Sequence, residues 1–129
     1  MARSYRNLIV WQKAKTLAVS IYRETANFPK TETYGLTAQL RRAVVSVTSN
    51  IAEGQGRLTR GKFVHFLGQA RGSLLEVDAQ LSIAFDLHYL SPEAHAGLDE
   101  EVYQTLGLLN RLIESIREPR SKNLETMKP

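Results

Sequence analysis

The 129-residue chain contains no cysteine, which excludes a disulfide framework and any metal site that is built on thiolate ligands. It also lacks a long apolar run. The stretch at residues 8–11 is too short for the core of a signal peptide, and no segment approaches the roughly 20 apolar residues of a membrane span. We therefore expect a cytoplasmic protein that has no membrane partner.

The rest of the composition is ordinary. Hydrophobic residues make up 43% of the chain and charged residues 23%, which is typical of a globular protein rather than a disordered one. The chain has room for one domain, because typical domains contain roughly 100–150 residues. Folding at this size removes about two-thirds of the surface from water, which is sufficient for a single hydrophobic core.

Positive charge is concentrated in the first part of the chain. The net charge is only +4, but residues 1–72 contain 12 Lys or Arg and 3 Asp or Glu, whereas residues 73–129 contain 5 and 10. This asymmetry indicates contact with nucleic acid or another polyanion. It is equally compatible with basic and acidic faces that meet between subunits, or with two oppositely charged, solvated faces of one subunit.

Apolar residues recur at intervals of three or four in four stretches, which predicts helices over residues 8–27, 33–53, 60–89 and 92–117. The third stretch keeps a heptad-like spacing, as expected for near-parallel packing in a bundle. Thr59 is the predicted N-cap of the third helix, and Ser91-Pro92-Glu93 predicts the start of the fourth. We expect Gly54 to end the second helix in a left-handed conformation, and Pro119 to close the fourth.

These elements predict an all-α fold, an antiparallel up-down-up-down four-helix bundle over residues 1–118. Residues 119–129 are polar and show no periodicity, so we expect a flexible, disordered tail. Some apolar residues lie off the main stripes, and one monomeric core would not obviously cover them. They favour self-association: Leu75, Phe85, Leu108 and Leu112.

Residues with catalytic or metal-binding chemistry are sparse. There is no Glu-x-x-His pair of the kind that di-metal bundles use, and His65, His88 and His95 have no partner at helical spacing. We therefore predict no metal, no cofactor and no catalytic residue. Arg60 and His65 do show the spacing of the HEPN-type ribonucleases, in which the histidine would act as general acid or base. Composition alone explains one such match, so ribonuclease activity is a second alternative only.

A cluster of cations in the glycine-rich segment 54–62 is a stronger signal. Arg57, Arg60 and Lys62 surround the start of the third helix, where free backbone N–H groups and the helix dipole already favour an anion. Arg41, Arg42 and Arg71 could extend this site, and all six are predicted nucleic-acid contacts. The alternative is that the glycines only end a helix, and that Glu53 or a neighbouring subunit neutralises the arginines. The segment is not a Walker loop, because the Gly-Lys-Ser/Thr ending is missing.

Two segments resemble a known family. Residues 7–14, Asn-Leu-Ile-Val-Trp-Gln-Lys-Ala, and residues 34–54, which include Tyr-Gly-Leu-Thr-Ala-Gln-Leu-Arg-Arg and Ser-Asn-Ile-Ala-Glu-Gly, resemble the small bacterial "four helix bundle protein" family. That family includes proteins encoded in intervening sequences of 23S ribosomal RNA genes, and it is similar to the accessory variability proteins of diversity-generating retroelements. The resemblance covers residues 5 to about 90. It departs at Thr48, where many relatives carry a proline.

The resemblance implies a bundle that assembles into a ring, a homopentamer, without established catalytic residues. For the retroelement relatives it implies binding of nucleic acid and of a reverse transcriptase. Together with the basic cluster, it predicts a non-enzymatic homo-oligomer that binds RNA or DNA by non-specific phosphate contacts. The first alternative is a purely structural or protein-partner scaffold with no nucleic-acid role.

Overall fold

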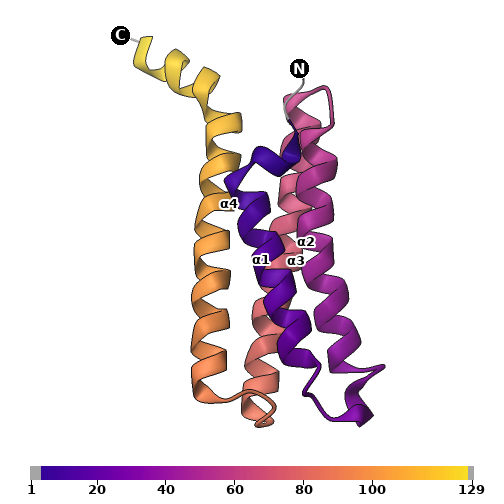
Figure 1. Cartoon of the computed structure of the whole chain (residues 1–129). Coiled ribbons are helices and arrows are strands. Elements are labelled where there is room, and N and C mark those ends of the chain that lie inside the picture. The colour runs from indigo at the N-terminus through magenta and orange to yellow at the C-terminus, as the bar shows by residue number, and fades with distance from the viewer. Residues whose placement is uncertain (1–3, 128–129) are drawn as a thin grey trace.

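The computed structural model describes the backbone of residues 4–127 and the side chains of residues 4–117. Its helices pack as an antiparallel up-down-up-down bundle, so the predicted fold is confirmed (Figure 1). No helix among these residues is long and apolar enough to cross a membrane. In chain order the elements are the 3-10 turn η1 (Tyr5–Asn7), α1 (Ile9–Thr25), the 3-10 turn η2 (Lys30–Glu32), α2 (Leu36–Gln55), α3 (Arg60–Asp86) and α4 (Pro92–Met127).

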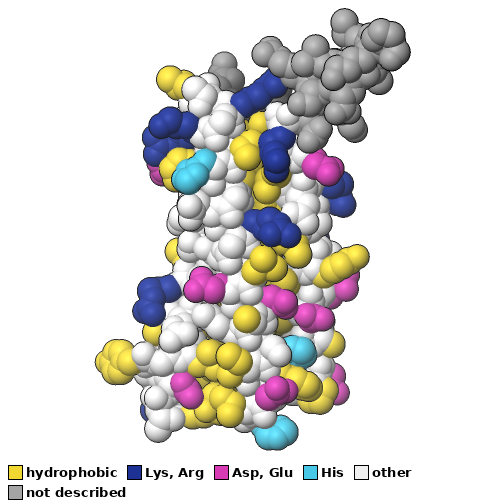
Figure 2. Space-filling model, turned by 180° about the vertical axis from the view of Figure 1, so that it is seen from behind, with side chains coloured by type: hydrophobic (Ala, Val, Ile, Leu, Met, Phe, Trp, Pro, Cys, Tyr) yellow, Lys and Arg dark blue, Asp and Glu magenta, His cyan; other side chains and the backbone are white. Residues whose placement is uncertain are grey.

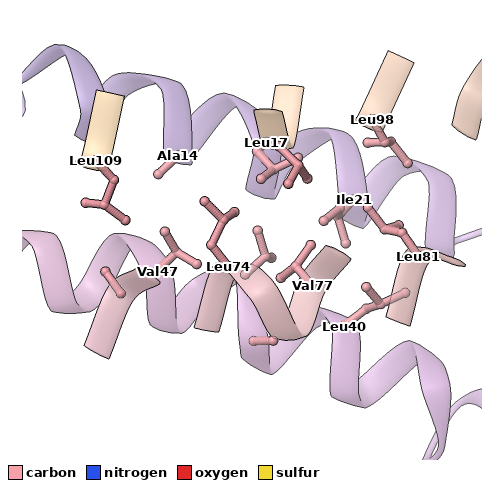
Figure 3. Close-up of a cluster of buried hydrophobic side chains, with 14 of the residues drawn as sticks. Ala14, Leu17, Ile21, Leu40, Val47, Leu74, Val77, Leu81, Leu98 and Leu109 are labelled. Carbon is pink, nitrogen blue, oxygen red and sulfur yellow. The ribbon is translucent and has the colours of Figure 1, made fainter. Parts of the chain in front are cut away.

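The core runs the length of the bundle. Leu17, Leu40, Leu74 and Leu109, one from each helix, are fully buried. Figure 3 shows side chains of all four helices pointing into the shared interior. The heptad-like spacing of α3 explains this continuity, because it keeps one buried apolar stripe facing the neighbouring helices over about five turns, from Leu67 to Ala84.

Two predicted N-caps are present. The Thr59 hydroxyl accepts a hydrogen bond from the Lys62 N–H at 3.2 Å, and the Ser91 hydroxyl accepts one from the Ala94 N–H at 3.0 Å. Each satisfies an N–H group that a helix start leaves without a partner. These local signals therefore placed the starts of α3 and α4 correctly.

The prediction for Gly54 is wrong. It lies inside α2 and is buried, and no glycine among the described residues has a positive φ. A Cβ at position 54 would lie 2.9 Å from Phe66 Cβ and 3.1 Å from Phe63 Cδ1. Glycine is therefore needed for the close approach of α2 and α3 rather than for a left-handed turn.

The second helix starts at Leu36, three residues later than predicted, because hydrogen bonds to the Glu32 side chain fix the turn that precedes it. One oxygen of the Glu32 carboxylate accepts the Leu36 N–H at 2.9 Å, and the other accepts the Tyr89 hydroxyl at 2.9 Å. A Cβ on Gly35 would lie 2.7 Å from that first oxygen. The hydrogen bond to Glu32 raises the pKa of Tyr89, because it favours the neutral phenol.

The third helix ends at Asp86 rather than at residue 89. His88 has a positive φ of 63°, and the Tyr89 N–H bonds back to the Ala84 carbonyl at 2.9 Å. This is the Schellman geometry that ends many helices, with histidine in a position that usually holds glycine. The turn directs the chain into α4.

The fourth helix does not end at residue 117. It continues through Pro119 to Met127, and Figure 1 shows its last part bending away from the bundle. A proline inside a helix removes one backbone hydrogen bond and bends the axis, but it need not stop the helix. The predicted flexibility of residues 119–129 stays a prediction, since their side chains are not described and residues 128–129 lie outside the described residues.

The chain itself covers several of the apolar residues that favoured self-association. Phe85 is half-buried and stacks on the His95 ring at a centroid distance of 4.3 Å. Leu108 and Leu112 are half-buried and pack against the core, whereas Leu75 is 41% exposed. Other large apolar side chains are exposed instead, and self-association stays a prediction. They include Val19, Tyr22, Val45, Ile83 and Leu87.

Candidate nucleic-acid interface

Charged side chains of α2, α3 and α4 are segregated along the axis of the bundle. The hydroxyls of Ser46 and Ser73, 2.9 Å apart, mark the middle of the α2–α3 contact. Among the described side chains, six basic residues and two acidic ones lie towards the α2–α3 turn. The opposite half holds two basic residues and the seven acidic residues between positions 76 and 101. Figure 2 shows Lys and Arg concentrated over the upper part of the molecule and most Asp and Glu over the lower part. We call the six basic residues of the first half the basic end: Arg57, Arg60, Lys62, Arg71, Arg111 and Arg117.

The close approach at Gly54 positions the turn between α2 and α3, and Arg57 lies in that turn. Its guanidinium carbon lies 4.8 Å from the centroid of the Phe66 ring, and it pairs with Glu53. The two side chains are 40% and 53% exposed. An ion pair this exposed is weak and is screened by salt, so Arg57 remains available to a stronger anion.

Arg60 and Lys62 lie in the first turn of α3, and both are exposed. Among the side chains of residues 4–117, the Arg57–Glu53 contact is the single ion pair, so no carboxylate of this part of the chain neutralises either of these two. No acidic residue lies in the first turn of α3. Two cations therefore add to the positive end of a helix dipole, a combination that attracts phosphate.

Two members of the basic end, Arg111 and Arg117, were missed by the sequence reasoning because they lie in the acidic part of the chain. The Arg71 Nε donates to the Asn110 side-chain oxygen at 2.8 Å, so the C-terminal half of α4 lies beside the N-terminal half of α3. Antiparallel helices therefore collect these cations at one end. The predicted topology, combined with the helical spacing, contained the signal that could have found them.

Arg41 and Arg42 do not join the basic end, because they lie in the other half of α2. Arg41 donates from Nε to the Thr25 hydroxyl at 2.9 Å and from a terminal nitrogen to the Tyr22 carbonyl at 3.2 Å, with its guanidinium over the Tyr22 ring. It satisfies a carbonyl and a hydroxyl group at the C-terminus of α1, which is a structural task. Arg42 is exposed and lines a cleft beside α3.

Arg60 and His65, the pair behind the ribonuclease alternative, are both exposed on α3, and that alternative stays a prediction. Five residues along a helix correspond to a rotation of about 140°, so the two side chains leave α3 on different sides. His65 is exposed, and its ring contacts Phe66 edge-on at a centroid distance of 5.3 Å. Within the described residues, no group of three or more His, Asp or Glu side chains could hold a metal ion.

The fold and the basic end define a small antiparallel four-helix bundle that carries a cluster of cations at one end. The chain belongs to the family of the 23S rRNA-intervening sequence proteins, whose family model matches residues 6–111. The family predicted from residues 7–14 and 34–54 is therefore confirmed.

A solved structure has a similar fold. It is a protein of unknown function from the S23 ribosomal protein family of Bacteroides thetaiotaomicron, with 22% sequence identity and a TM-score of 0.74 over 82% of this chain and 99% of that chain. At this identity the likeness shows the fold alone. No curated protein matches the chain significantly.

Proposed function

We propose that this protein is a non-enzymatic, self-associating bundle that binds RNA or DNA through phosphate contacts at the basic end. The observation that carries the proposal is the convergence of six cations from three segments of the chain, opposed among the described side chains by Glu53 and Glu114 alone. Lys and Arg that neutralise phosphates release condensed counterions, which supplies affinity independently of sequence.

The kind of recognition follows from the donors that the basic end offers. Guanidinium and ammonium groups on helix surfaces contact phosphates, which fixes the position of a nucleic acid but does not identify bases. Specificity would then come from the shape of the nucleic acid or from a protein partner. A slope of log affinity against log salt of up to about −5 per chain follows if all six cations contact phosphates.

Self-association would multiply this affinity. Several copies, a pentamer if the resemblance holds, would present several basic ends to one nucleic acid, and linked weak sites bind far more tightly than single ones. The exposed apolar side chains of α1 and α3, including Val19 and Ile83, support a contact between copies. A mass measurement by light scattering tests this part directly.

The test of nucleic-acid binding is charge reversal at Arg60 and Lys62, which form no ion pair within the described residues. Fluorescence anisotropy with labelled RNA and DNA, from 50 to 300 mM salt, would measure affinity and its salt dependence. We expect the double variant Arg60→Glu/Lys62→Glu to lose at least about tenfold in affinity and to show a shallower salt slope. Absence of binding by the unaltered protein would refute the proposal.

The matched control is Arg23→Glu/Lys30→Glu. It makes the same change in net charge at exposed positions near the opposite end of the bundle. If both double variants bind equally weakly, total charge rather than the basic end determines affinity. If the Arg60/Lys62 variant instead dissociates while nucleic-acid binding is absent throughout, the scaffold alternative is correct, since basic residues then meet acidic residues of another copy.

A further inference from the structure

A groove lined by polar and apolar groups runs along α2 and α3 from the basic end towards Arg42. Near the basic end it is a hollow of about 540 Å³ on α3, beside His65 and over Gly68 and Gly72. Farther along it is a cleft of about 740 Å³ between the two helices. The two parts are continuous because Ser73 and Glu76 line both. We call this feature the α2–α3 groove.

The groove is kept open by glycines that the fold itself does not need. A Cβ added at Gly68 or Gly72 would meet nothing within 4 Å. Glycine in a helix interior costs about 1 kcal/mol relative to alanine, and here no contact within the chain explains that cost. The absence of side chains leaves the backbone of α3 accessible to a ligand.

Uncharged hydrogen-bonding groups line the cleft. The hydroxyls of Ser46 and Ser73 lie 2.9 Å apart, and the side-chain amides of Gln39 and Gln80 face each other at 3.5 Å. The Gln80 side-chain oxygen is buried and has no hydrogen-bond partner. Groups of this kind suit a ligand that accepts and donates hydrogen bonds. Apolar side chains, Tyr22, Ala43 and Val45, also line the cleft and can pack against sugars or bases.

Cations lie at both ends of the groove. Lys62 occurs seven residues before Gln69 and fourteen before Glu76, so it lies on the groove side of α3. Arg42 lines the far end, is exposed and has no carboxylate partner among the described residues. Glu76 is the carboxylate of the groove, and it opposes the binding of an anion.

We propose that the α2–α3 groove binds one strand of single-stranded nucleic acid, with phosphates at Lys62 and Arg42 and sugars or bases against the neutral groups between them. This inference rests on the proposed function and specifies its ligand. Packed helices have axes about 8–10 Å apart, so a groove between them admits a single strand but not a duplex. The exposed His65 ring beside the hollow offers a surface on which a base can stack.

The length of the groove fits a short segment of single-stranded nucleic acid. From Arg42 to the end of α2 at Gln55 the helix rises about 20 Å. That distance accommodates about six nucleotides at the roughly 3.4 Å spacing of a stacked strand, and fewer in an extended strand. The site would therefore be at the lower end of the range for single-stranded binding.

The experiment compares a labelled 12-nucleotide single strand with a labelled 12-base-pair duplex at one salt concentration. Gly72→Leu places a side chain in the groove at a position where an added Cβ meets nothing within 4 Å. Gly97→Leu on α4, where a Cβ also meets nothing within 4 Å, is the matched control. We expect Gly72→Leu to weaken single-strand binding about tenfold, equivalent to the loss of one base contact, and to leave duplex binding within twofold. Glu76→Gln should strengthen single-strand binding about threefold, because the change removes a negative charge that repels the phosphates.

The outcomes separate this inference from the proposed function. If the unaltered protein binds neither probe, both are wrong. If it binds both probes and Gly72→Leu behaves like Gly97→Leu, the basic end binds nucleic acid but the groove does not. A changed mass of Gly72→Leu in light scattering, with unchanged binding, would show that the groove holds a second protein chain and would overturn the inference.

Discussion

Replacing Gly54 by alanine tests the close approach that positions the basic end. The new Cβ would lie 2.9 Å from Phe66 Cβ, 3.1 Å from Phe63 Cδ1 and 3.2 Å from the Phe63 carbonyl oxygen. The first and third of these atoms move only with the backbone of α3, so the clash cannot be relieved by rotating a side chain. Overpacking of this kind typically costs about 1–3 kcal/mol.

Helix propensity acts in the opposite direction, and a control variant removes it from the comparison. Alanine in place of glycine inside a helix gains about 1 kcal/mol, which offsets part of the clash at position 54. At Gly68, where a Cβ meets nothing within 4 Å, the same exchange should give that gain alone. We therefore expect Gly54→Ala to be about 2 kcal/mol less stable than Gly68→Ala, and about 1 kcal/mol less stable than the unaltered protein.

Urea unfolding followed by circular dichroism at 222 nm measures these free energies, with all proteins at one concentration because self-association would link stability to concentration. Comparable slopes against urea would show that the variants unfold from similar structures. Equal free energies of unfolding for Gly54→Ala and Gly68→Ala would refute the reasoning, since they would mean that α2 and α3 are not in tight contact at this point.

Three further changes have expected outcomes. Arg41→Gln should lower the free energy of unfolding by about 2 kcal/mol, because two charge-assisted hydrogen bonds to the end of α1 are lost. Arg42→Gln should stay within about 0.5 kcal/mol of the unaltered protein, and equal effects of the two changes in urea unfolding would contradict the capping role of Arg41. His88→Gly should raise stability by about 1 kcal/mol and the melting temperature by a few degrees, because glycine adopts the φ of 63° without strain; a lower melting temperature would argue against it. Burial raises the pKa of Glu101 above its usual 4.5, although the Ser20 hydroxyl and Lys13 oppose the shift, so its ionisation reduces stability as the pH rises through the folded-state pKa. The stability advantage of Glu101→Gln over the unaltered protein should therefore grow between pH 4 and pH 7, and a pH-independent difference in thermal melts would show that burial does not cause the shift.

The sequence predicted those features that depend on neighbouring residues in the chain. Thr59 and Ser91 cap their helices through bonds to residues three positions later, so the pattern contained both partners. The apolar periodicity likewise predicted the core and the topology, because each helix must bury one stripe. The end of α4 was misplaced, since a proline indicates a helix end only statistically and the helix passes through Pro119 with a bend.

Features that depend on contacts distant in the sequence were not predictable from one chain. Gly54 is compatible with a left-handed turn or with a close helix approach, and only the position of Phe66 decides between them. Arg41 looks like any surface cation until the end of α1, sixteen residues earlier, is placed beside it. The candidate site itself was half predicted. The cations of segment 57–62 were identified, but the two arginines of α4 that lie near them, Arg111 and Arg117, depend on how the helices are arranged.

Separation of charge along the axis also makes the bundle an electric dipole. Helix α3 has 27 residues and spans about 40 Å, several times the roughly 8 Å Debye length at physiological salt. A nearby polyanion therefore exerts a torque that turns the molecule end-on before the surfaces touch, while the acidic half is repelled. Encounters would become oriented as well as faster, and this steering would fade as the ionic strength rises.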